Sequence, residues 1–299
     1  MRSVSCAEPP AWDRCEALMT TEPERPMTSF LFWNIMRKDL RALIAAAVAE
    51  RDVDVLMLAE SGVSDAEVSA ELKTTTGRDY AALSQESDKV RLFTRLTNAN
   101  WVRRQQDPTN ARSTVWSAEI GRPPGIILAT AHLVSKGHET TYGQSHLAAE
   151  ISTEIFRLED YLGHQRTLFV GDLNMNPFED GVISSHALHA VMTRQLAQKG
   201  ERVVQGKSRR FLYNPMWGFF GDRTGGPAGT YYHRSATDAE LFWHMLDQVL
   251  LRPALMDSLH DLAILDRVGG QSLLTASTGR PNTMIASDHL PLAFRLNLE

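Results

Sequence analysis

Short hydrophobic runs alternate with amphipathic stretches along most of the chain. Runs of β-branched and aromatic residues predict strands, whereas apolar residues spaced three and four apart predict helices. The predicted strands cover residues 29–33, 53–59, 90–95, 113–120, 125–132, 167–170, 242–252 and 290–298. The predicted helices cover residues 39–51, 64–73, 142–162 and 185–198. Strands with helices interspersed predict one α/β (α+β) domain, in which two packed sheets are flanked by helices.

Two of these predictions carry finer detail. Ser64 and Glu67 have the spacing of a capping box, which favours a helix that begins at Ser64. Apolar and polar residues alternate through 113–120, which indicates an antiparallel strand with one face exposed.

Two stretches lie outside this pattern. Residues 1–26 hold four prolines and many charges without periodicity, so we expect a disordered leader before a domain at 27–299. Residues 199–235 are rich in glycine, arginine and aromatic residues, and a structureless loop of that length inside a compact domain is usually functional. The alternative is that its aromatic side chains simply pack beneath the loop.

Composition narrows the class of protein. Hydrophobic residues make up 43% of the 299 residues, which is ordinary for a packed domain. The net charge of -5 argues against a protein that coats nucleic acid with a broad basic face. It does not exclude a nucleic-acid enzyme, because bound divalent cations restore positive potential locally. The only two cysteines, Cys6 and Cys15, are too few for a disulfide framework, which fits a cytoplasmic location. No apolar run approaches the ~20 residues of a membrane span.

The stretch from Gly171 to Pro177 carries the first candidate chemistry. Asp172 and Asn174 directly follow the predicted strand 167–170, and Gly171 lets the backbone approach closely. Catalytic groups collect at such strand ends in layered α/β proteins. For this motif alone, an Asx turn that caps the next segment is an equal alternative.

Five polar landmarks lie at the ends of predicted strands, and a sixth lies inside one. They are Asn34, Glu60, His132, the pair Asp172 and Asn174, the triplet Ser287-Asp288-His289, and Asp247 within 242–252. Each alone has an ordinary interpretation as a loop, packing or turn residue. A carboxylate in an apolar strand needs a partner, because an unpaired buried charge is costly, and His289 is available to Asp247.

The order of these motifs resembles that of the endonuclease/exonuclease/phosphatase superfamily, from Phe30 to the C-terminus. The motifs are Phe32-Trp33-Asn34, Leu58-Ala59-Glu60, Ala131-His132-Leu133, Gly171-Asp172-Leu173-Asn174, Leu246-Asp247 and Ser287-Asp288-His289-Leu290-Pro291-Leu292. The fourth and the last motif together are specific, although either alone would be weak. The resemblance implies a deoxyribonuclease I-like fold, a four-layer sandwich of two packed mixed sheets flanked by helices.

Two positions depart from the family pattern. Ala59 stands where many members have glutamine, and Met36 stands where abasic-site endonucleases have an aspartate. A close relationship to abasic-site enzymes is therefore not expected. Through His132, the sequence instead resembles the deoxyribonuclease I and sphingomyelinase members of the superfamily.

The resemblance also implies a metal site built from oxygen ligands. Glu60, with help from Asn34 and Asp288, is expected to hold Mg²⁺ or Mn²⁺. The chain offers no sulfur or multi-histidine cage that would favour zinc.

The remaining landmarks are expected to be catalytic. Asp172 would orient and deprotonate the attacking water, and Asn174 would fix the phosphoryl group. Asp247 would orient His289 against the scissile phosphate, and His132 would donate to a phosphoryl or leaving oxygen. Whether Asp172 or the pair of Asp247 and His289 is the general base stays open at this point.

These roles predict a divalent-metal-dependent phosphodiester hydrolase, and we expect a nuclease that cleaves DNA or RNA. Arginines and aromatic residues of 199–235 are expected to hold phosphates and stack bases of this nucleic-acid partner. The candidate substrate-binding residues are Arg209, Arg210, Trp217, Arg223, Tyr231, Tyr232 and Arg234. The alternative is a phosphatase or phosphodiesterase that acts on a small-molecule or lipid phosphate ester, and a catalytically silent binding module comes third. The sequence identifies no protein partner.

Overall fold

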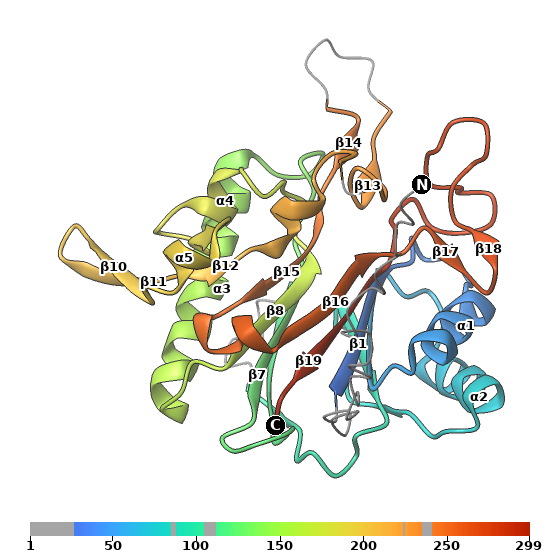
Figure 1. The fold of residues 1–299 in the computed structure, drawn as a ribbon, viewed down its shortest axis with the longest axis horizontal. Coiled ribbons are helices and arrows are strands. Elements are labelled where there is room, and N and C mark those ends of the chain that lie inside the picture. The colour runs from blue at the N-terminus through green and yellow to red at the C-terminus, as the bar shows by residue number, and fades with distance from the viewer. Residues whose placement is uncertain (1–26, 85–87, 105–111, 224, 235–240) are drawn as a thin grey trace, which may run out of the picture.

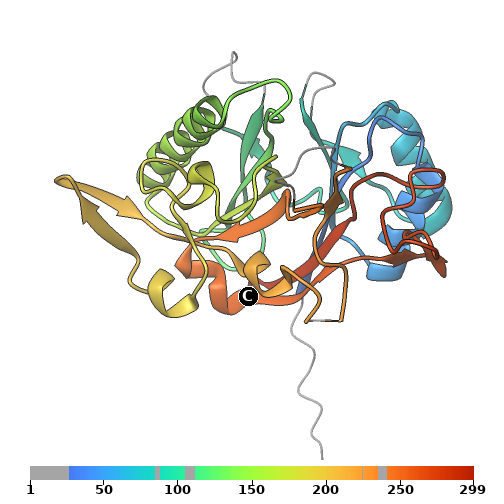
Figure 2. The ribbon, with the colours of Figure 1, turned by 90° about the horizontal axis from the view of Figure 1, so that it is seen from above.

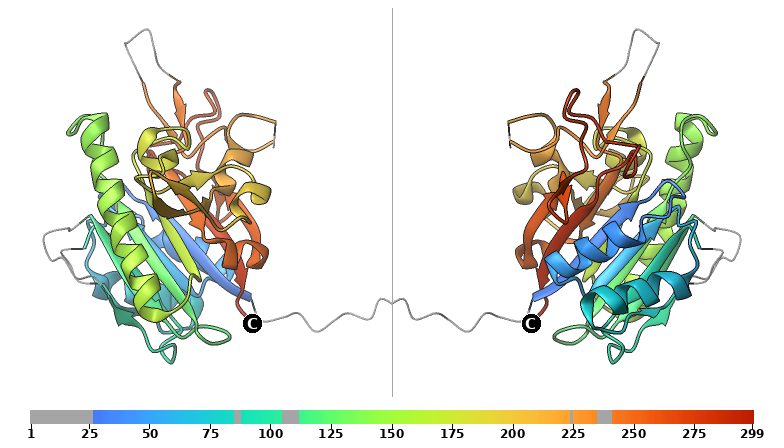
Figure 3. Two further views of the ribbon diagram at one scale, coloured as in Figure 1. Left: turned by 90° about the vertical axis from the view of Figure 1, so that its left-hand side faces the viewer. Right: turned by 90° about the vertical axis from the view of Figure 1, so that its right-hand side faces the viewer.

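Two β-sheets pack face to face, and helices cover the outer face of each sheet (Figure 1; Figure 3). The protein is described by a computed structural model over residues 27–84, 88–104, 112–223, 225–234 and 241–299. The expected leader at 1–26 lies outside the described residues. The predicted α/β class and its four layers are confirmed.

The first sheet has six strands in the order β16-β19-β1-β2-β4-β3. Its strands are β1 Met27–Asn34, β2 Val55–Ala59, β3 Ala81–Ala82, β4 Val90–Thr94, β16 Leu259–Ile264 and β19 Leu292–Asn297. Strands β1 and β2 are parallel, and the other pairs are antiparallel. The last strand of the chain therefore lies inside this sheet, beside the first.

The second sheet has seven strands in the order β5-β6-β7-β8-β15-β12-β9. Its strands are β5 Val102–Arg103, β6 Ser113–Ala118, β7 Ile126–His132, β8 Thr167–Asp172, β9 Ala190–Val191, β12 Leu212–Tyr213 and β15 Asp247–Leu251. The central strands β7 and β8 are parallel, and β15 runs antiparallel to β8. This mixed sheet places the ends of β7 and β8 and the start of β15 at one edge.

Side chains of the central strands alternate between two hydrophobic cores. Leu168 and Val170 of β8 face the core between the sheets, whereas Phe169 packs in the core under α3. Leu128 and Ile127 of β7 divide in the same way. Because both faces of these strands are covered, their sequences are almost continuously apolar.

The helices cover the two outer faces. They are α1 Arg41–Arg51, α2 Asp65–Thr76, α3 Thr141–Leu162, α4 Asp180–Ile183 and α5 Arg194–Ala197, with the 3-10 helices η1 Pro215–Phe219 and η2 Pro253–Ser258. Ser64 caps α2, and both hydrogen bonds of the predicted capping box are present. In the part of the chain that the structure describes, no helix combines the length and apolar composition needed to cross a membrane.

The prediction that 199–235 is a structureless loop is wrong, because about half of the segment forms regular structure. It contains the hairpin β10 Glu201–Val204 and β11 Lys207–Arg210, then β12, η1 and β13 Tyr231–Tyr232. Strand β13 pairs with β14 Trp243–His244, and a third small hairpin joins β17 Arg267–Val268 to β18 Gln271–Ser272. Gln205 and Gly206 both take positive φ angles, which lets the chain turn tightly between β10 and β11.

Three other predictions need correction. The expected helix at 185–198 is instead a turn, β9 and α5, because the chain reverses at His189, which has a φ of 54°. Strand β6 is not half-exposed, because the sheet pairs on both edges and packing on both faces bury it. The strand expected at 242–252 divides into β14 and β15, since Met245 donates its backbone N–H to the side chain of Asn176 instead of to a neighbouring strand.

Candidate active site

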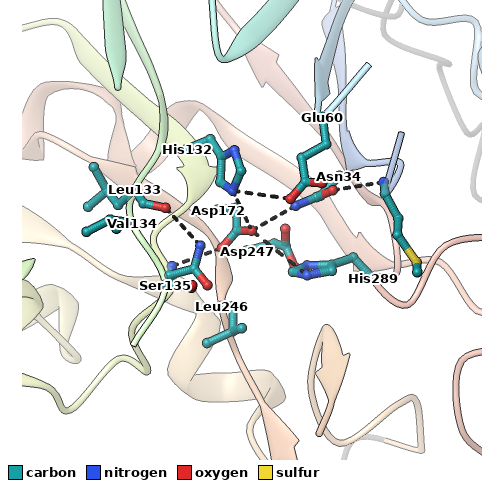
Figure 4. A network of polar contacts seen from close by, with 12 residues as sticks. Asn34, Glu60, His132, Leu133, Val134, Ser135, Asp172, Leu246, Asp247 and His289 are labelled. Carbon is teal, nitrogen blue, oxygen red and sulfur yellow. Dashed lines mark hydrogen bonds and ion pairs between the residues drawn. The ribbon is translucent and has the colours of Figure 1, made fainter. Parts of the chain in front are cut away.

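Strand ends from both sheets meet at one place in the molecule. Asn34 ends β1, Glu60 follows β2, His132 ends β7 and Asp172 ends β8. Asp247 begins β15 and stands directly opposite Asp172 in the ladder. The side chains of these residues point toward one another (Figure 4). The structure therefore brings these landmarks together.

A cavity of about 980 Å³ opens above this junction. The predicted site residues that line it are Glu60, His132, Asp172, Asn174, Tyr231, Asp288 and His289. Asn34 and Asp247 lie behind this lining, where each contacts a residue that reaches the cavity.

The carboxylate of Asp172 joins the two sheets. Asn34 Nδ2, from the first sheet, donates to Asp172 Oδ2 at 2.9 Å, and the backbone N–H of Asn174 donates to Oδ1 at 2.9 Å. The nearest nitrogens of His132 and His289 lie 3.7 and 3.9 Å from the same Oδ2. The side chain is only 1% exposed, so one carboxylate oxygen is fixed among an amide and two imidazoles.

The backbone at Gly171 and at Asn174 makes this arrangement possible. A Cβ on Gly171 would stand 2.0 Å from the carbonyl oxygen of Ala131 in the parallel neighbour, so only glycine fits there. Asn174 has a φ of 50°, and its side-chain amide donates to the carbonyl of Leu133 at 2.9 Å. The Asn174 side chain is therefore held by the residue that follows β7.

Asp247 and His289 form the predicted buried pair. His289 Nδ1 lies 2.8 Å from Asp247 Oδ2, and the Asp247 side chain is fully buried, which confirms the predicted contact. Burial raises the pKa of Asp247 to about 6, although His289 opposes this shift. Burial alone would lower the pKa of His289, but Asp247 and Asp172 outweigh it and raise the pKa to about 10. At neutral pH the geometry therefore holds an imidazolium beside an ionised carboxylate.

The segment that carries His289 is tied to the first strand. Ser287 Oγ donates to the carbonyl oxygen of Asn34 at 2.6 Å, and Trp33 Nε1 donates to the carbonyl oxygen of His289 at 2.9 Å. The ring of Tyr231 lies against the His289 ring, with 4.7 Å between centroids. These contacts together fix the position of the His289 imidazole.

His132 and Glu60 face each other across the cavity. His132 Nε2 lies 3.6 Å from Glu60 Oε1, and burial lowers the pKa of His132 despite the nearby carboxylates of Asp172 and Glu60. His132 is therefore a neutral imidazole that can donate from Nε2. The Glu60 side chain is 31% exposed and lies 3.8 Å from Arg37 Nε, so it faces the open part of the cavity.

The donor chemistry fits a hard divalent cation. Glu60, Asp172 and Asp288 all line the cavity with carboxylate oxygens, which Mg²⁺ and Mn²⁺ prefer. Asn34 is a weaker candidate than the sequence suggested, because its amide nitrogen donates to Asp172 and its oxygen accepts from the Met36 backbone. A buried group of Asp172, Asp247 and His289 also offers three ligand atoms within 4.8 Å of one another and could bind an ion. Within that group, however, the short contact of His289 with Asp247 occupies the Nδ1 atom.

Two buried polar residues that the sequence did not reveal support the site. The Thr230 hydroxyl accepts the backbone N–H groups of Leu246 and Asp247, each at 3.1 Å, where β15 begins. Gln144 of α3 donates to the carbonyls of Val134 and Asn174 at 2.8 and 3.1 Å. Neither had a sequence signal, because a single threonine or glutamine in a polar stretch is ordinary.

Basic side chains that were not among the predicted site residues also line the cavity. The additional basic residues in the lining are Arg37, Lys89, Arg91, Arg112, Lys136, His138, His233 and His244. Several lie just beyond a strand, as Lys89 does before β4 and Lys136 does after β7. This position beside strand ends is the signal by which the sequence could have pointed to them.

Of the seven substrate-binding candidates, the structure brings only Tyr231 to the cavity. Tyr232 points to the other face of its hairpin, where its ring contacts Phe242 and Trp243. Trp217 packs against Phe178, which matches the packing alternative, and Arg223 and Arg234 are absent from the cavity lining.

Arg209 and Arg210 lie on the hairpin β10–β11, and they do not line the cavity. Arg210 is bound by Glu159 and Asp160 of α3, at 2.9 and 2.5 Å, so its charge is compensated there. The sequence offered no sign of this, since the partners are about fifty positions apart.

Comparison with known proteins agrees with this architecture. Among solved structures, an AP endonuclease from Archaeoglobus fulgidus is similar with a TM-score of 0.53 and 11% identity, covering 90% of this chain and 99% of that chain. The endonuclease domain of TRAS1, a telomere-specific non-LTR retrotransposon, is similar with a TM-score of 0.51 and 14% identity. This match covers 91% of this chain and 99% of that chain. The human Nocturnin catalytic domain with bound sulfate is similar with a TM-score of 0.52 and 17% identity, covering 91% of this chain and 94% of that chain. No curated protein matches the chain.

These structural likenesses, at such low identity, speak for the deoxyribonuclease I-like fold alone. The sequence profile of the Endonuclease/Exonuclease/phosphatase family matches residues 31–289, which includes the polar landmarks from Asn34 to His289. Members of this family are phosphoesterase hydrolases that generally use divalent metals. The chain therefore belongs to the endonuclease/exonuclease/phosphatase family.

Proposed function

We propose that this chain is a divalent-metal-dependent phosphodiester hydrolase that cleaves polynucleotides. The observation that carries the hydrolase part is the Asp172 carboxylate, which lies within 4 Å of both His132 and His289 at the floor of an open cavity. We assign the activity to one domain of residues 27–299, because the site takes Asn34 from the first sheet and Asp172 from the second.

Asp172 is the better general base of the two candidates. His289 carries a proton at neutral pH, because Asp247 and Asp172 raise its pKa, and it cannot accept another. Asp172 can take the proton of an attacking water while Asn34 and the Asn174 backbone hold the carboxylate in place. The charged His289 and the neutral His132 then stabilise negative charge that develops on the phosphoryl oxygens.

We propose Glu60 and Asp288 as the ligands of the metal ion. Both carboxylates line the cavity, and Glu60 is partly exposed toward the substrate side. A bound Mg²⁺ or Mn²⁺ would neutralise phosphoryl charge and lower the pKa of a bound water. Asn34 then acts by orienting Asp172.

Activity should depend on Mg²⁺ or Mn²⁺ and should disappear in excess chelator. Glu60→Gln should raise the metal concentration that gives half-maximal rate by at least ~10-fold, because it removes the charge of the proposed ligand. Steady-state rates on a small generic phosphodiester across a metal titration provide the measurement. Glu71→Gln, a carboxylate change on α2 outside the cavity lining, is the matched control. Turnover that persists undiminished in chelator would eliminate the metal role.

The polynucleotide part of the proposal is supported by charge around the cavity. Arg37, Lys89 and Lys136 line it in addition to the catalytic histidines. Lys136 Nζ lies 2.7 Å from Glu179 Oε2, and Arg37 Nε lies 3.8 Å from Glu60 Oε2. It is therefore mainly Lys89 that adds positive charge beyond the space of one phosphate. Phosphate contacts of this kind position nucleic acids without reading their sequence. Two of the similar solved structures are endonucleases by description, which favours the same class here.

Lys89→Ala should separate polynucleotide cleavage from chemistry on small esters. We expect cleavage of a single-stranded oligonucleotide to fall by roughly 3- to 10-fold and its log–log salt slope to become shallower by about 1, because one phosphate contact is lost. Hydrolysis of the small diester should change by less than about twofold. Lys73→Ala on α2 provides a control with the same loss of charge.

A small-molecule or lipid phosphate ester remains the second candidate, favoured by the acidic net charge of -5. This second candidate would be supported if Lys89→Ala and the unaltered protein had equal rates on both substrates and if the small ester were hydrolysed rapidly. If neither polynucleotides nor small esters were hydrolysed under any metal condition, the chain would have to be regarded as a binding module.

A further inference from the structure

The hairpin β10–β11 projects from the body of the molecule and is unusually basic. It extends to the left beyond α5 in Figure 1, and Figure 2 shows it projecting in the same direction. Residues 199–210 contain five lysines and arginines and one glutamate, within a chain whose net charge is -5. None of these residues lines the cavity. We call residues 201–210 the basic arm.

Two arginines stand directly opposite each other on the basic arm. Arg202 of β10 pairs with Arg209 of β11 in the antiparallel ladder. Directly opposed residues bring their Cβ atoms to about 5 Å, and like charges in such a pair destabilise a two-stranded ribbon. The arm therefore carries an electrostatic cost in the absence of an anion.

Neither arginine of this pair is compensated by a carboxylate in the described parts of the chain. Arg202 Nε donates to His189 Nε2 at 3.0 Å, and Arg209 Nη2 lies 3.3 Å from His186 Nδ1. Among the described residues, the buried Nε of Arg209 has no hydrogen-bond partner. Arg210, by contrast, is compensated by Glu159 and Asp160.

The histidine contact orients Arg202 without neutralising it. His189 is 2% exposed, and its ring packs on Phe211 with 4.3 Å between centroids. Burial and the charge of Arg202 lower the pKa of His189 to about 4, so its imidazole is neutral near pH 7. Its Nδ1 lies 3.2 Å from the Arg210 carbonyl oxygen and donates to it, which leaves Nε2 as the acceptor for Arg202. The guanidinium keeps its full charge in a fixed orientation.

We propose that Arg202 and Arg209 form a phosphate-binding site, which holds the backbone of a polynucleotide substrate outside the cavity. A pair of planar guanidinium groups matches the oxygens of a phosphodiester, and an anion between them removes the like-charge repulsion. This inference rests on the proposed nuclease function. It implies that a long strand gains a contact that a short one cannot make.

Arg202→Gln tests the site in the full-length protein. Binding of fluorescent single-stranded oligonucleotides is followed by anisotropy in excess chelator, which prevents cleavage, with strands of ~30 and ~5 nucleotides. For the long strand we expect roughly 3- to 10-fold weaker binding and a log–log salt slope that is shallower by ~0.7. Binding of the short strand should change by less than about twofold.

Two further variants make the result specific. Lys199→Gln removes the same charge just before the arm, and it should leave long-strand binding within about twofold of the original. Arg202→Lys keeps the charge but loses the planar fork, so it should keep the salt slope of the unaltered protein and lose part of the affinity. Such a split would not follow from mere unfolding of the arm.

The outcomes distinguish the two proposals. If the unaltered protein binds and cuts long strands but Arg202→Gln behaves identically, or no worse than Lys199→Gln, the phosphate site is wrong and the nuclease assignment stands. If the unaltered protein hydrolyses a small diester but neither binds nor cuts any oligonucleotide, the nuclease assignment fails and the phosphate site fails with it.

Discussion

Asp172→Asn should abolish turnover while the protein stays folded and still binds metal. The substitution keeps the shape of the side chain but removes the charge that accepts the proton of the attacking water. We expect the rate on a small phosphodiester to fall by at least ~10³-fold, near the upper range for loss of a general base. Metal binding should be largely preserved, because Glu60 and Asp288 still face the cavity.

Initial rates, calorimetric titration with Mn²⁺ and thermal melting together test this prediction. Asp180→Asn at the start of α4 is the matched control, since it removes an exposed carboxylate that does not line the cavity. If Asp172→Asn and Glu60→Gln had the same metal titration and the same residual rate, the division of roles between the two carboxylates would be wrong.

The second large effect is expected for the pair of Asp247 and His289. Asp247→Asn and His289→Gln should each lower the rate by roughly 10²- to 10⁴-fold. The first change removes the carboxylate that orients His289 and favours its protonation, and the second removes the imidazole itself. The two groups share one hydrogen bond of 2.8 Å and act as a unit, so the double variant should be only a few-fold slower than the more impaired single variant.

The measurement is a double-mutant cycle on kcat, with melting temperatures to confirm that all three proteins fold. Independent groups would give losses that multiply. A double variant whose loss equals the product of the two single losses would therefore show that Asp247 does not act through His289.

The grouping of the candidate site residues was predictable because strand ends constrain position strongly. Parallel strands such as β7 and β8 finish at the same edge, so His132 and Asp172 had to be neighbours once both strands were recognised. A carboxylate inside an apolar strand had to have a partner, and that argument correctly joined Asp247 to His289 across 42 positions.

Substrate contacts were not predictable in the same way. A stretch rich in arginine and aromatic residues looks the same whether it covers a site, packs on a helix or projects into solvent. Arg210 shows the difficulty, because only the fold brings Glu159 to it. The helix expected at 185–198 failed for a related reason, since pairing of β9 with β12 outweighed a weak helical pattern.

The place of β19 in the first sheet has a consequence for how the protein is made. This strand, Leu292–Asn297, lies between β16 and β1, and His289 comes just before it. A growing chain that has not yet released these residues from the ribosome lacks both the strand that pairs with β1 and β16 and the histidine that contacts Asp247. Asn34, Glu60 and Asp172 are synthesised long before His289, so a nascent chain that ends before residue 289 cannot assemble this group of side chains.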